Sequence, residues 1–304
     1  MLKKIIKSKV VQFMLMLIRL LYWPLYLVKR KKMNFKIMSS LETTEYLHDK
    51  KISISRFGDG ELNLIFRNRS IGFQSYSDKL RVNLVNVAKT GNNNKLMLAL
   101  PFGLKETKGL KLKEKAFWWS YTVRNAEKIN DLFARNTTYL NTNFTRTIGE
   151  LTDQENAKLV VKRTMELWEG RDVLIIEGVD TRFGVGNTLL NKANNVFRIL
   201  APAENSYSKI EEIFKKTDEV ASKINKPLIL LALGPTATLL ACSLSSKYQA
   251  IDIGHFDLMY EEFRQRMGFS SNVDTRYNNE KTGGEHVNQI NDTKYKSEIK
   301  YVIS

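Results

Sequence analysis

Short runs of apolar residues alternate with helical patterns from about residue 50 to the end of the chain. The runs are continuous, which is typical of strands that are buried on both faces of a parallel sheet. The predicted strands are 51–57, 95–103, 171–179, 195–202, 226–235 and 248–255, with a short final strand in 300–304. The predicted helices are 38–50, 78–90, 114–135, 153–168, 187–194, 206–224 and 236–247. This order predicts an α/β, Rossmann-like fold with a mostly parallel sheet and flanking helices.

The stretch from about residue 104 to 150 fits this alternation less well. It is rich in Lys, Asn, Thr and aromatic residues, as in "FWWSYTVRN" and "YLNTNFTRT". We interpret it as a helical insertion in a single domain that spans residues 34–304. Such an insertion would cover the open edge of the sheet or form a site for an acceptor substrate.

A separate apolar segment precedes this domain. Residues 10–28, "VVQFMLMLIRLLYWPLYLV", would form a helix of roughly 28 Å, close to the thickness of a hydrocarbon core. However, Arg19 sits in the middle, where a charge is costly inside a bilayer. Pro24 would kink or end the helix. Gln12 and Arg19 lie seven residues apart and therefore share one narrow polar stripe.

We predict that residues 1–33 form a helix with basic flanks that lies in the membrane surface. Residues 1–32 contain nine basic side chains and no acidic one, which suits anionic lipid. Tyr22, Trp23 and Tyr26 are of the types that prefer the headgroup layer. The alternatives are a helix that spans the membrane, a signal peptide, which lacks a small-x-small cleavage site here, and a helix packed on the protein's own core.

Charge and composition narrow the function classes. The formal net charge is +16, of which the first 32 residues supply +9, so the remainder is only mildly basic. This distribution argues against a nucleic-acid partner, because the concentrated charge flanks an apolar segment. The single cysteine, Cys242, cannot form an internal disulfide and is consistent with a cytoplasmic setting. No His/Cys cluster has the spacing of a zinc site.

Ligands of an open parallel sheet bind beyond the carboxyl ends of its strands, so the loops after the predicted strands should carry the chemistry. The first of these loops is "RFGDGE". Gly58 and Gly60 permit a tight backbone path that lets Asp59 and Glu61 face one point. Two such carboxylates suit a hard divalent cation. The alternative is a helix start at which Asp59 is the cap and Glu61 stabilises the first turn.

The loop "EGVDTRFGVGN" follows the clearest predicted strand. Gly184 and Gly186 would bring backbone N–H groups close to a phosphate at the start of the helix predicted from Asn187. Arg182 would grip the same phosphate in a bidentate manner. The glycine spacing is not that of a dinucleotide-binding fingerprint. The alternative is a plain turn with a surface arginine.

Two further loops contain candidates for nucleotide binding. "LGPTATLL" begins another helix, where Gly234 and Thr236 would face a ligand, although Pro and Thr are also ordinary at a helix start. "APAENSY" contains Asn205, a residue type that can recognise a base or a ribose. Plain capping of the following helix explains Asn205 equally well.

The loop "DIGHFDLMYEE" is the richest in functional side chains. Asp257 and Glu261 are four residues apart and share one face if the segment is helical. A carboxylate at this place can deprotonate a hydroxyl nucleophile. His255 is either a ligand-binding residue or a buried histidine at the end of a strand.

These blocks together resemble the GT-D glycosyltransferases of bacterial surface glycosylation. Five ordered blocks carry the resemblance, which makes it specific: "SRFGDGELNLI", "EGVDTRFGVGN", "RILAPAENSY", "LALGPTATLLA" and "AIDIGHFDLMYE". It runs from about residue 50 to 280, and "RYNNE" at 276–280 is similar to a late element of the family that closes over the nucleotide.

The resemblance implies metal-assisted transfer of a sugar from a UDP-sugar. The D-x-E element of the family corresponds to Asp59 and Glu61, which by this analogy hold Mn²⁺ or Mg²⁺ that bridges the nucleotide diphosphate. This favours the metal interpretation of the pair over the helix cap. We assign to nucleotide binding Arg56, Arg182, Gly184, Gly186, Asn187, Asn205, Gly234, Thr236 and His255.

The resemblance leaves the catalytic base between Asp257 and Glu261, and we favour Glu261. The chain departs from the family pattern nearby, with Met259 in the place of an acid and Glu262 in the place of an aromatic residue. The acceptor would be a hydroxyl of a surface glycan or of a lipid-linked or protein-linked oligosaccharide. The basic apolar N-terminal segment lies outside the resemblance and motivates the lipid-linked option.

The expected partners are therefore a UDP-sugar, a glycan acceptor and an anionic membrane surface, with a homo-oligomer as a further possibility. The expected location is the cytoplasmic face of the cell membrane, to which the protein would bind peripherally. Two other functions compete with glycosyl transfer. One is a Rossmann-type methyltransferase that uses the glycine loops for a nucleoside cofactor, and the other is a non-catalytic membrane-associated scaffold.

Overall fold

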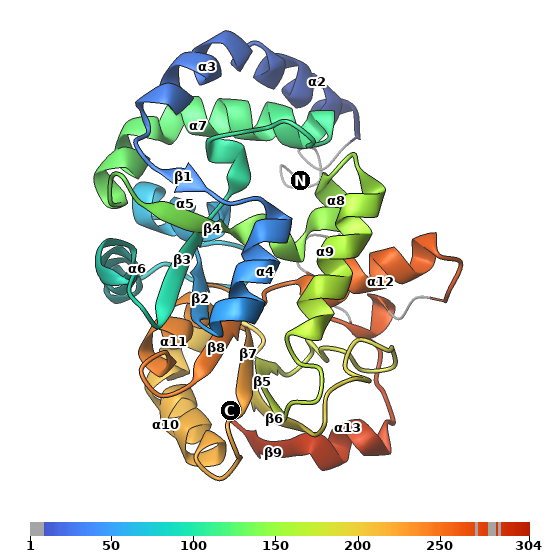
Figure 1. The fold of residues 1–304 in the computed structure, drawn as a ribbon. Coiled ribbons are helices and arrows are strands. Elements are labelled where there is room, and N and C mark those ends of the chain that lie inside the picture. The colour runs from blue at the N-terminus through green and yellow to red at the C-terminus, as the bar shows by residue number, and fades with distance from the viewer. Residues whose placement is uncertain (1–8, 271–272, 279–283, 285–286) are drawn as a thin grey trace.

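The computed structural model describes residues 9–270, 273–278, 284 and 287–304 (Figure 1). The described strands form one nine-stranded sheet, ordered β1-β4-β3-β2-β8-β7-β5-β6-β9, in which all neighbouring strands are parallel. The strands are β1 (Lys36–Ile37), β2 (Ser53–Arg56), β3 (Leu96–Leu100), β4 (Thr138–Asn141), β5 (Val173–Gly178), β6 (Val196–Ala201), β7 (Leu228–Ala232), β8 (Gln249–Asp252) and β9 (Ile299–Val302).

Helices flank both faces of this sheet, as the alternating pattern predicts (Figure 1). They are α2 (Lys9–Leu20), α3 (Trp23–Lys32), α4 (Ser40–Lys50), α5 (Asp59–Arg67), α6 (Asp78–Thr90), α7 (Leu112–Leu132), α8 (Thr147–Glu150), α9 (Gln154–Glu166), α10 (Ile210–Ala221), α11 (Pro235–Leu244), α12 (Phe256–Arg266) and α13 (Thr293–Glu298). Short 3₁₀ turns cover Phe102–Leu104, Thr142–Thr145, Ser206–Lys209 and Val273–Thr275. The α/β class and the parallel sheet predicted from the sequence are confirmed.

The central strands are apolar throughout because helices cover both of their faces. In β5, Val173 and Ile175 face a core shared with α4, α9 and α12, whereas Leu174 and Ile176 face a core shared with α10 and α11. All four side chains are fully buried. Side chains alternate between the faces of a strand, so a strand between two helical layers needs an apolar residue at every position.

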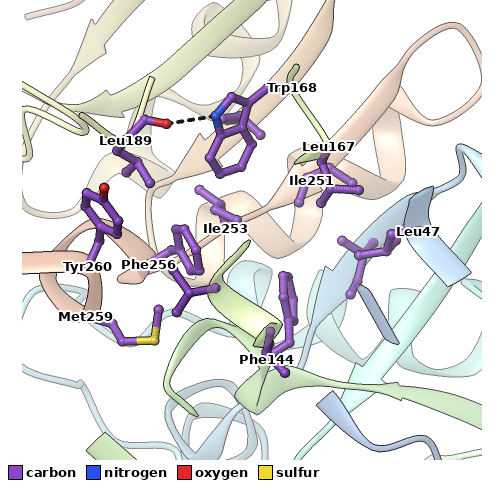
Figure 2. Close-up of a cluster of buried hydrophobic side chains, with 14 of the residues drawn as sticks. Leu47, Phe144, Leu167, Trp168, Leu189, Ile251, Ile253, Phe256, Met259 and Tyr260 are labelled. Carbon is purple, nitrogen blue, oxygen red and sulfur yellow. Dashed lines mark hydrogen bonds between the residues drawn. The ribbon is translucent and has the colours of Figure 1, made fainter. Parts of the chain in front are cut away.

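One of these cores fixes the start of α12, where two predicted site residues lie. Phe256 is fully buried and meets Trp168 edge-on, with ring centroids 6.0 Å apart. The Trp168 indole N–H donates to the carbonyl oxygen of Leu189 at 2.9 Å, so this buried donor is satisfied (Figure 2). Ile253 and Met259 complete the packing around Phe256 (Figure 2). The loop between β8 and α12 is therefore held rigidly.

The stretch 104–150 is not only a helical insertion. Its first part forms the predicted helix, α7, but Thr138–Asn141 is strand β4, which pairs with β1 on one side and β3 on the other. Tyr139 and Leu140 are buried in this strand. Strand β4 was not predicted from the sequence because only four residues are extended and polar side chains lie at both ends.

The helix predicted at 187–194 is wrong, because this segment consists of turns. The side chain of Asn187 bonds to the backbone of the segment and thereby competes with a helical backbone, and that of Asn194 bonds outside the segment. The Asn187 side chain accepts from the backbone N–H of Leu189 at 2.9 Å, and the Asn194 side chain donates to Asp172 at 2.8 Å. No helix N-terminus therefore follows Gly186.

The N-terminal segment forms two helices, α2 and α3, which are bent by 60° and both lie along α7 (Figure 1). Pro24 lies in the first turn of α3, where its missing N–H costs nothing. Tyr26 is buried against Trp119 and not in a headgroup layer. The alternative of a helix packed on the protein's own core is therefore correct for the face of α2 and α3 that contacts α7. No single helix among the described residues is long and apolar enough to cross a membrane, although the bent pair together passes the test of length and composition.

Candidate functional site

A cleft of about 600 Å³ opens at the carboxyl ends of the strands. Seven strands lead directly into its lining, which is where a parallel sheet places a ligand. The contributing residues are Arg56 at the end of β2 and 58–61 after it, Pro101 after β3, Thr142, Asn143 and Thr145 after β4, Gly178 and Thr181 around the end of β5, Ala203 after β6, Leu233 and Gly234 after β7, and Gly254, His255 and Asp257 after β8.

Asp59 and Glu61 both line this cleft at the beginning of α5. Glu61 also caps the helix, because its Oε2 accepts from the backbone N–H of Gly58 at 2.8 Å. Burial, and after it the neighbouring Asp252 carboxylate, raise the pKa of Glu61 to about 7. The alternative of Asp59 as the helix cap is wrong, because Gly58 occupies the N-cap position and Glu61 makes the capping bond. This bond does not remove the Glu61 carboxylate from the cleft.

The two carboxylates fit a divalent cation that a ligand helps to bind. No group of three or more His, Cys, Asp or Glu side chains within the described ranges is arranged to hold a metal ion. Mg²⁺ commonly takes one or two carboxylates and completes its shell with water and substrate phosphates, which matches Asp59 and Glu61 beside an open cleft. The raised pKa of Glu61 reflects its burial first and the neighbouring Asp252 carboxylate second, and a cation would favour the charged form against both.

Arg56, which lines the cleft, connects strand β8 with the segment after β4. Its Nε donates to Asp252 on β8 at 3.1 Å, and its Nη1 donates to Thr145 after β4 at 2.6 Å. Gly254 makes this arrangement possible, because a Cβ atom built there would lie 1.8 Å from the Arg56 Nη2. Gly254 also has φ of +51°, a backbone conformation that L-residues rarely adopt. The predicted candidates Gly234 and His255 line the same cleft.

Asp257 and Glu261 lie together in a buried polar network, as their helical spacing predicts. Asp257 accepts from the backbone N–H of Gly184 at 2.9 Å and from the Asn187 side chain at 3.0 Å, and it pairs with Arg276. Glu261 accepts from Asn187 at 2.6 Å and is fully buried. Only Asp257 lines the cleft, so the geometry favours it over Glu261 as a group that meets substrate.

The remaining residues assigned to the nucleotide lie outside the lining of the cleft. Arg182 is buried and donates to the carbonyl oxygens of Thr275 and Asn288, at 2.8 and 2.6 Å, so it fastens the C-terminal segment to the end of β5. The Asn205 side chain accepts from the backbone N–H of Ser75 at 2.7 Å.

Gly184 and Gly186 of the loop after β5 lie outside the lining of the cleft, but this loop bonds to Asp257, which lines it. Gly184 and Gly186 both have positive φ, and the Gly184 N–H is bonded to Asp257, which turns this loop toward α12. Thr236 is fully buried in α11, and its hydroxyl has no hydrogen-bond partner among the described residues. The phosphate cradle predicted for this loop is therefore not supported by the arrangement of Arg182, Gly184 and Gly186.

One wall of the cleft was not predicted, because it comes from the stretch 104–150 that the sequence suggests is an insertion. Thr142, Asn143 and Thr145 follow β4, Arg146 directly precedes α8, and Glu150 is the last residue of α8. A polar loop directly after a strand is the signal that would have identified them, but β4 itself was not recognised. Lining residues from the N-terminal and insertion helices were also missed: Gln12 and Arg19 from α2, and Lys113, Glu114, Phe117 and Trp118 from α7.

Glu150 is the second cleft carboxyl with a strongly shifted pKa. It is buried, accepts from the Asn143 side chain at 2.5 Å and from the Arg146 Nε at 3.0 Å, and burial raises its pKa to about 7. Buried carboxyls that titrate near neutral pH are typical of acid–base groups, although ion-pair networks produce the same shift.

Comparisons with known proteins agree with this geometry. The family description "Glycosyltransferase GT-D fold" matches residues 54–281. The chain is similar to "Probable glycosyl transferase Gly" of Streptococcus gordonii, with 30% identity over 274 residues that make up 90% of this chain and 39% of that protein. It is also similar to "Glycosyltransferase GlyD" of Streptococcus pneumoniae serotype 4, with 29% identity over 259 residues, 85% of this chain and 31% of that protein. The chain thus spans less than two fifths of these curated relatives.

Solved structures share the whole fold. A structure described as "The highly conserved domain of unknown function 1792 has a distinct glycosyltransferase fold" superimposes with a TM-score of 0.83 at 29% identity, covering 92% of this chain and 100% of that one. A new glycosyltransferase of Streptococcus sanguinis superimposes with a TM-score of 0.80 at 31% identity, covering 89% of this chain and 100% of that one. The resemblance predicted from the sequence is confirmed.

Proposed function

Because the chain belongs to the family of glycosyltransferases with the GT-D fold, we propose that it moves a sugar from a UDP-sugar to a hydroxyl of a glycan acceptor. The observation that carries this proposal is the cleft at the carboxyl ends of the strands, with Asp59 and Glu61 at the start of α5. The family match sets aside the methyltransferase and the scaffold as alternatives.

The donor is proposed to enter with its diphosphate beside Asp59 and Glu61, which would hold Mn²⁺ or Mg²⁺. When bound, such a cation neutralises charge that develops on the leaving diphosphate. Arg56 lies on the cleft floor and adds positive charge close to the same place, although Asp252 already balances much of it. Gly234 and His255 line the cleft and are available for contacts with the nucleotide.

The acceptor hydroxyl needs a base, and two carboxyls in the cleft are candidates. Asp257 is one of the two bases that the sequence left open, where Glu261 was favoured, but its oxygens already accept from Gly184, Asn187 and Arg276. Glu150 is the other, and its raised pKa lies close to neutral pH, where a general base works best. Glu261 does not line the cleft, so we propose that it positions Asn187 and Arg276.

The acceptor is proposed to be a bacterial surface glycan or an oligosaccharide carried by a lipid or a protein. Peripheral binding to the cytoplasmic face of the cell membrane and assembly into a homo-oligomer stay predictions. The curated relatives are longer than this chain, so their full activity is not transferred to it.

The test combines a donor screen with two matched variants. Purified protein with Mn²⁺ is incubated with a panel of nucleotide sugars, and release of the nucleotide is measured. Glu61→Gln is compared with Glu42→Gln, because the Glu42 carboxylate caps α4 by accepting from the Ser39 N–H at 2.7 Å, yet Glu42 is not part of the cleft. Both variants weaken a capping contact, by roughly 1 kcal/mol of helix stability.

The proposal expects turnover of a UDP-sugar by the wild type and by Glu42→Gln, with loss of Mn²⁺-dependent turnover and UDP binding in Glu61→Gln and in Asp59→Asn. Isothermal titration with UDP and with S-adenosylmethionine checks the cofactor class independently. Equal activity of all variants, or activity with no dependence on a divalent cation, would overturn the metal site.

A further inference from the structure

Helix α2 has two faces with different surroundings. One face packs on α7, and from it Gln12 and Arg19 reach the lining of the cleft. The Arg19 guanidinium lies 5.5 Å from the centroid of the Phe117 ring, which also lines the cleft. The polar stripe that the sequence places on this helix is therefore the stripe that faces the site.

The opposite face of α2 is apolar and exposed. Phe13, Met14, Leu17 and Ile18 of α2 and Leu21 directly after it follow one another at helical spacing. Their exposed fractions are 56%, 60%, 47%, 56% and 77%. The stripe continues onto α3, where Leu25 and Val28 are exposed as well. Figure 1 shows both helices at the outer edge of the molecule, on the far side of α7 from the sheet. A contiguous apolar surface of this kind marks an interaction site.

The charge beside this stripe identifies its partner as an anionic surface. Residues 1–32 contain nine basic side chains and no acidic one. Lys31 and Lys32 are exposed at the end of α3, while Lys29 and Arg30 pair with Glu127 and Glu106 of the protein's own fold. A second copy docking through the same face would bring like charges together, whereas a surface with phosphate headgroups complements both the apolar and the basic residues.

We propose that α2 and α3 bind the surface of an anionic lipid bilayer and that α2 thereby forms the boundary between lipid and the catalytic cleft. The apolar stripe would sit among the acyl chains while Gln12 and Arg19 stay on the cleft side. A helix with its side chains is roughly 10 Å across, so the cleft wall lies about one helix diameter from the lipid. An acceptor carried by a lipid would enter the cleft beside α2, a part of this proposal that rests on the proposed glycosyl transfer.

The packed face of the pair favours a helix that lies on the membrane over one that crosses it. Tyr26 is 1% exposed and its ring lies tilted against that of Trp119. Lys29 pairs with Glu127 of α7, and Arg30 pairs with Glu106 in the segment before α7. If α2 and α3 crossed a membrane, they would lose these contacts with the rest of the protein. Deleting residues 1–32 would also uncover Trp119, so point substitutions on the exposed stripe are the cleaner test.

The test measures binding of the full chain to vesicles of phosphatidylglycerol and phosphatidylcholine in equal parts, by co-sedimentation. The variant Leu17→Glu/Ile18→Glu changes two outward residues that do not line the cleft. The matched control is Val82→Glu on α6, where Val82 is 48% exposed but lies away from α2. Phe13→Gln/Leu21→Gln is a second, uncharged pair in case the first is insoluble.

We expect both α2 pairs to weaken vesicle binding by roughly tenfold or more, since each buries less apolar surface in the lipid. Val82→Glu should bind as the wild type does, and pure phosphatidylcholine vesicles should bind less protein. UDP-sugar hydrolysis without an acceptor should be equal in all forms, which separates this proposal from the proposed function. Unchanged vesicle binding in both pairs, or a dimer in sedimentation that dissociates in them without any lipid binding, overturns the proposal.

The position of the cleft is tested with a fluorophore on Lys113→Cys in a Cys242→Ser background, because Lys113 is exposed on α7 and lines the cleft. Brominated lipids should quench this label and should leave a label on Val82→Cys unquenched. Quenching at position 82 alone would overturn the proposed orientation.

Discussion

Replacing Gly254 with alanine should lower the free energy of unfolding by more than the backbone conformation of Gly254 alone explains. An L-residue at φ of +51° costs about 1–2 kcal/mol. The new Cβ would also lie 1.8 Å from the Arg56 Nη2, so the guanidinium must leave its place. Asp252, whose side chain is 3% exposed, would then lose its ion-pair partner, which adds about 3 kcal/mol.

The control is Gly170→Ala, because Gly170 has φ of +67° and nothing lies within 4 Å of the added Cβ. Unfolding in urea should give a free-energy loss of about 1–2 kcal/mol for the control and about 4–5 kcal/mol for Gly254→Ala. Titration with UDP and Mn²⁺ should in addition show weaker binding to Gly254→Ala only. Equal destabilisation by the two variants would refute the role assigned to the contact between Gly254 and Arg56.

Other substitutions probe the supports around the cleft. Phe256→Ala should lower the free energy of unfolding by roughly 3–5 kcal/mol in denaturant titrations, because a fully buried ring is lost. Glu150 has a folded pKa of about 7 against 4.5 without the fold, so the unfolded chain loses its proton first and stability falls as pH rises from 4.5 to 7. Glu150→Gln should reduce the loss of stability between pH 4.5 and 7 by up to about 3 kcal/mol. An unchanged stability–pH profile would contradict the raised pKa of Glu150. Arg182→Ala should speed proteolysis of the C-terminal segment, since it frees the carbonyls of Thr275 and Asn288, and equal cleavage rates would argue against that tether.

The sheet could be predicted because buried parallel strands have a distinctive sequence. Each of the six long apolar runs corresponds to a strand, since β5 and its neighbours need apolar side chains on both faces. Strand β4 escaped because its four residues are too few and too polar at the ends to give that pattern. The missing strand hid Thr142, Asn143 and Thr145, which follow it into the cleft.

Within the site, the sequence predicted the loops better than the side chains. Asp59, Glu61, His255 and Asp257 line the cleft because each stands within a few residues of a strand end or at a helix start. Arg182 does not, because its guanidinium finds backbone carbonyls of the C-terminal segment, and such long-range contacts leave no local signal. For the same reason, the approach of α2 to the cleft could not be foreseen from the stripe of Gln12 and Arg19 alone.

A crystal structure of the protein with UDP and Mn²⁺ tests the central claim most directly. The account predicts one ion held by carboxylate oxygens of Asp59 and Glu61 at roughly 2.0–2.3 Å, with the UDP diphosphate on its open side and inside the cleft lined by Arg56 and Gly234. A nucleotide bound elsewhere, or an ion that neither carboxylate contacts, would contradict it.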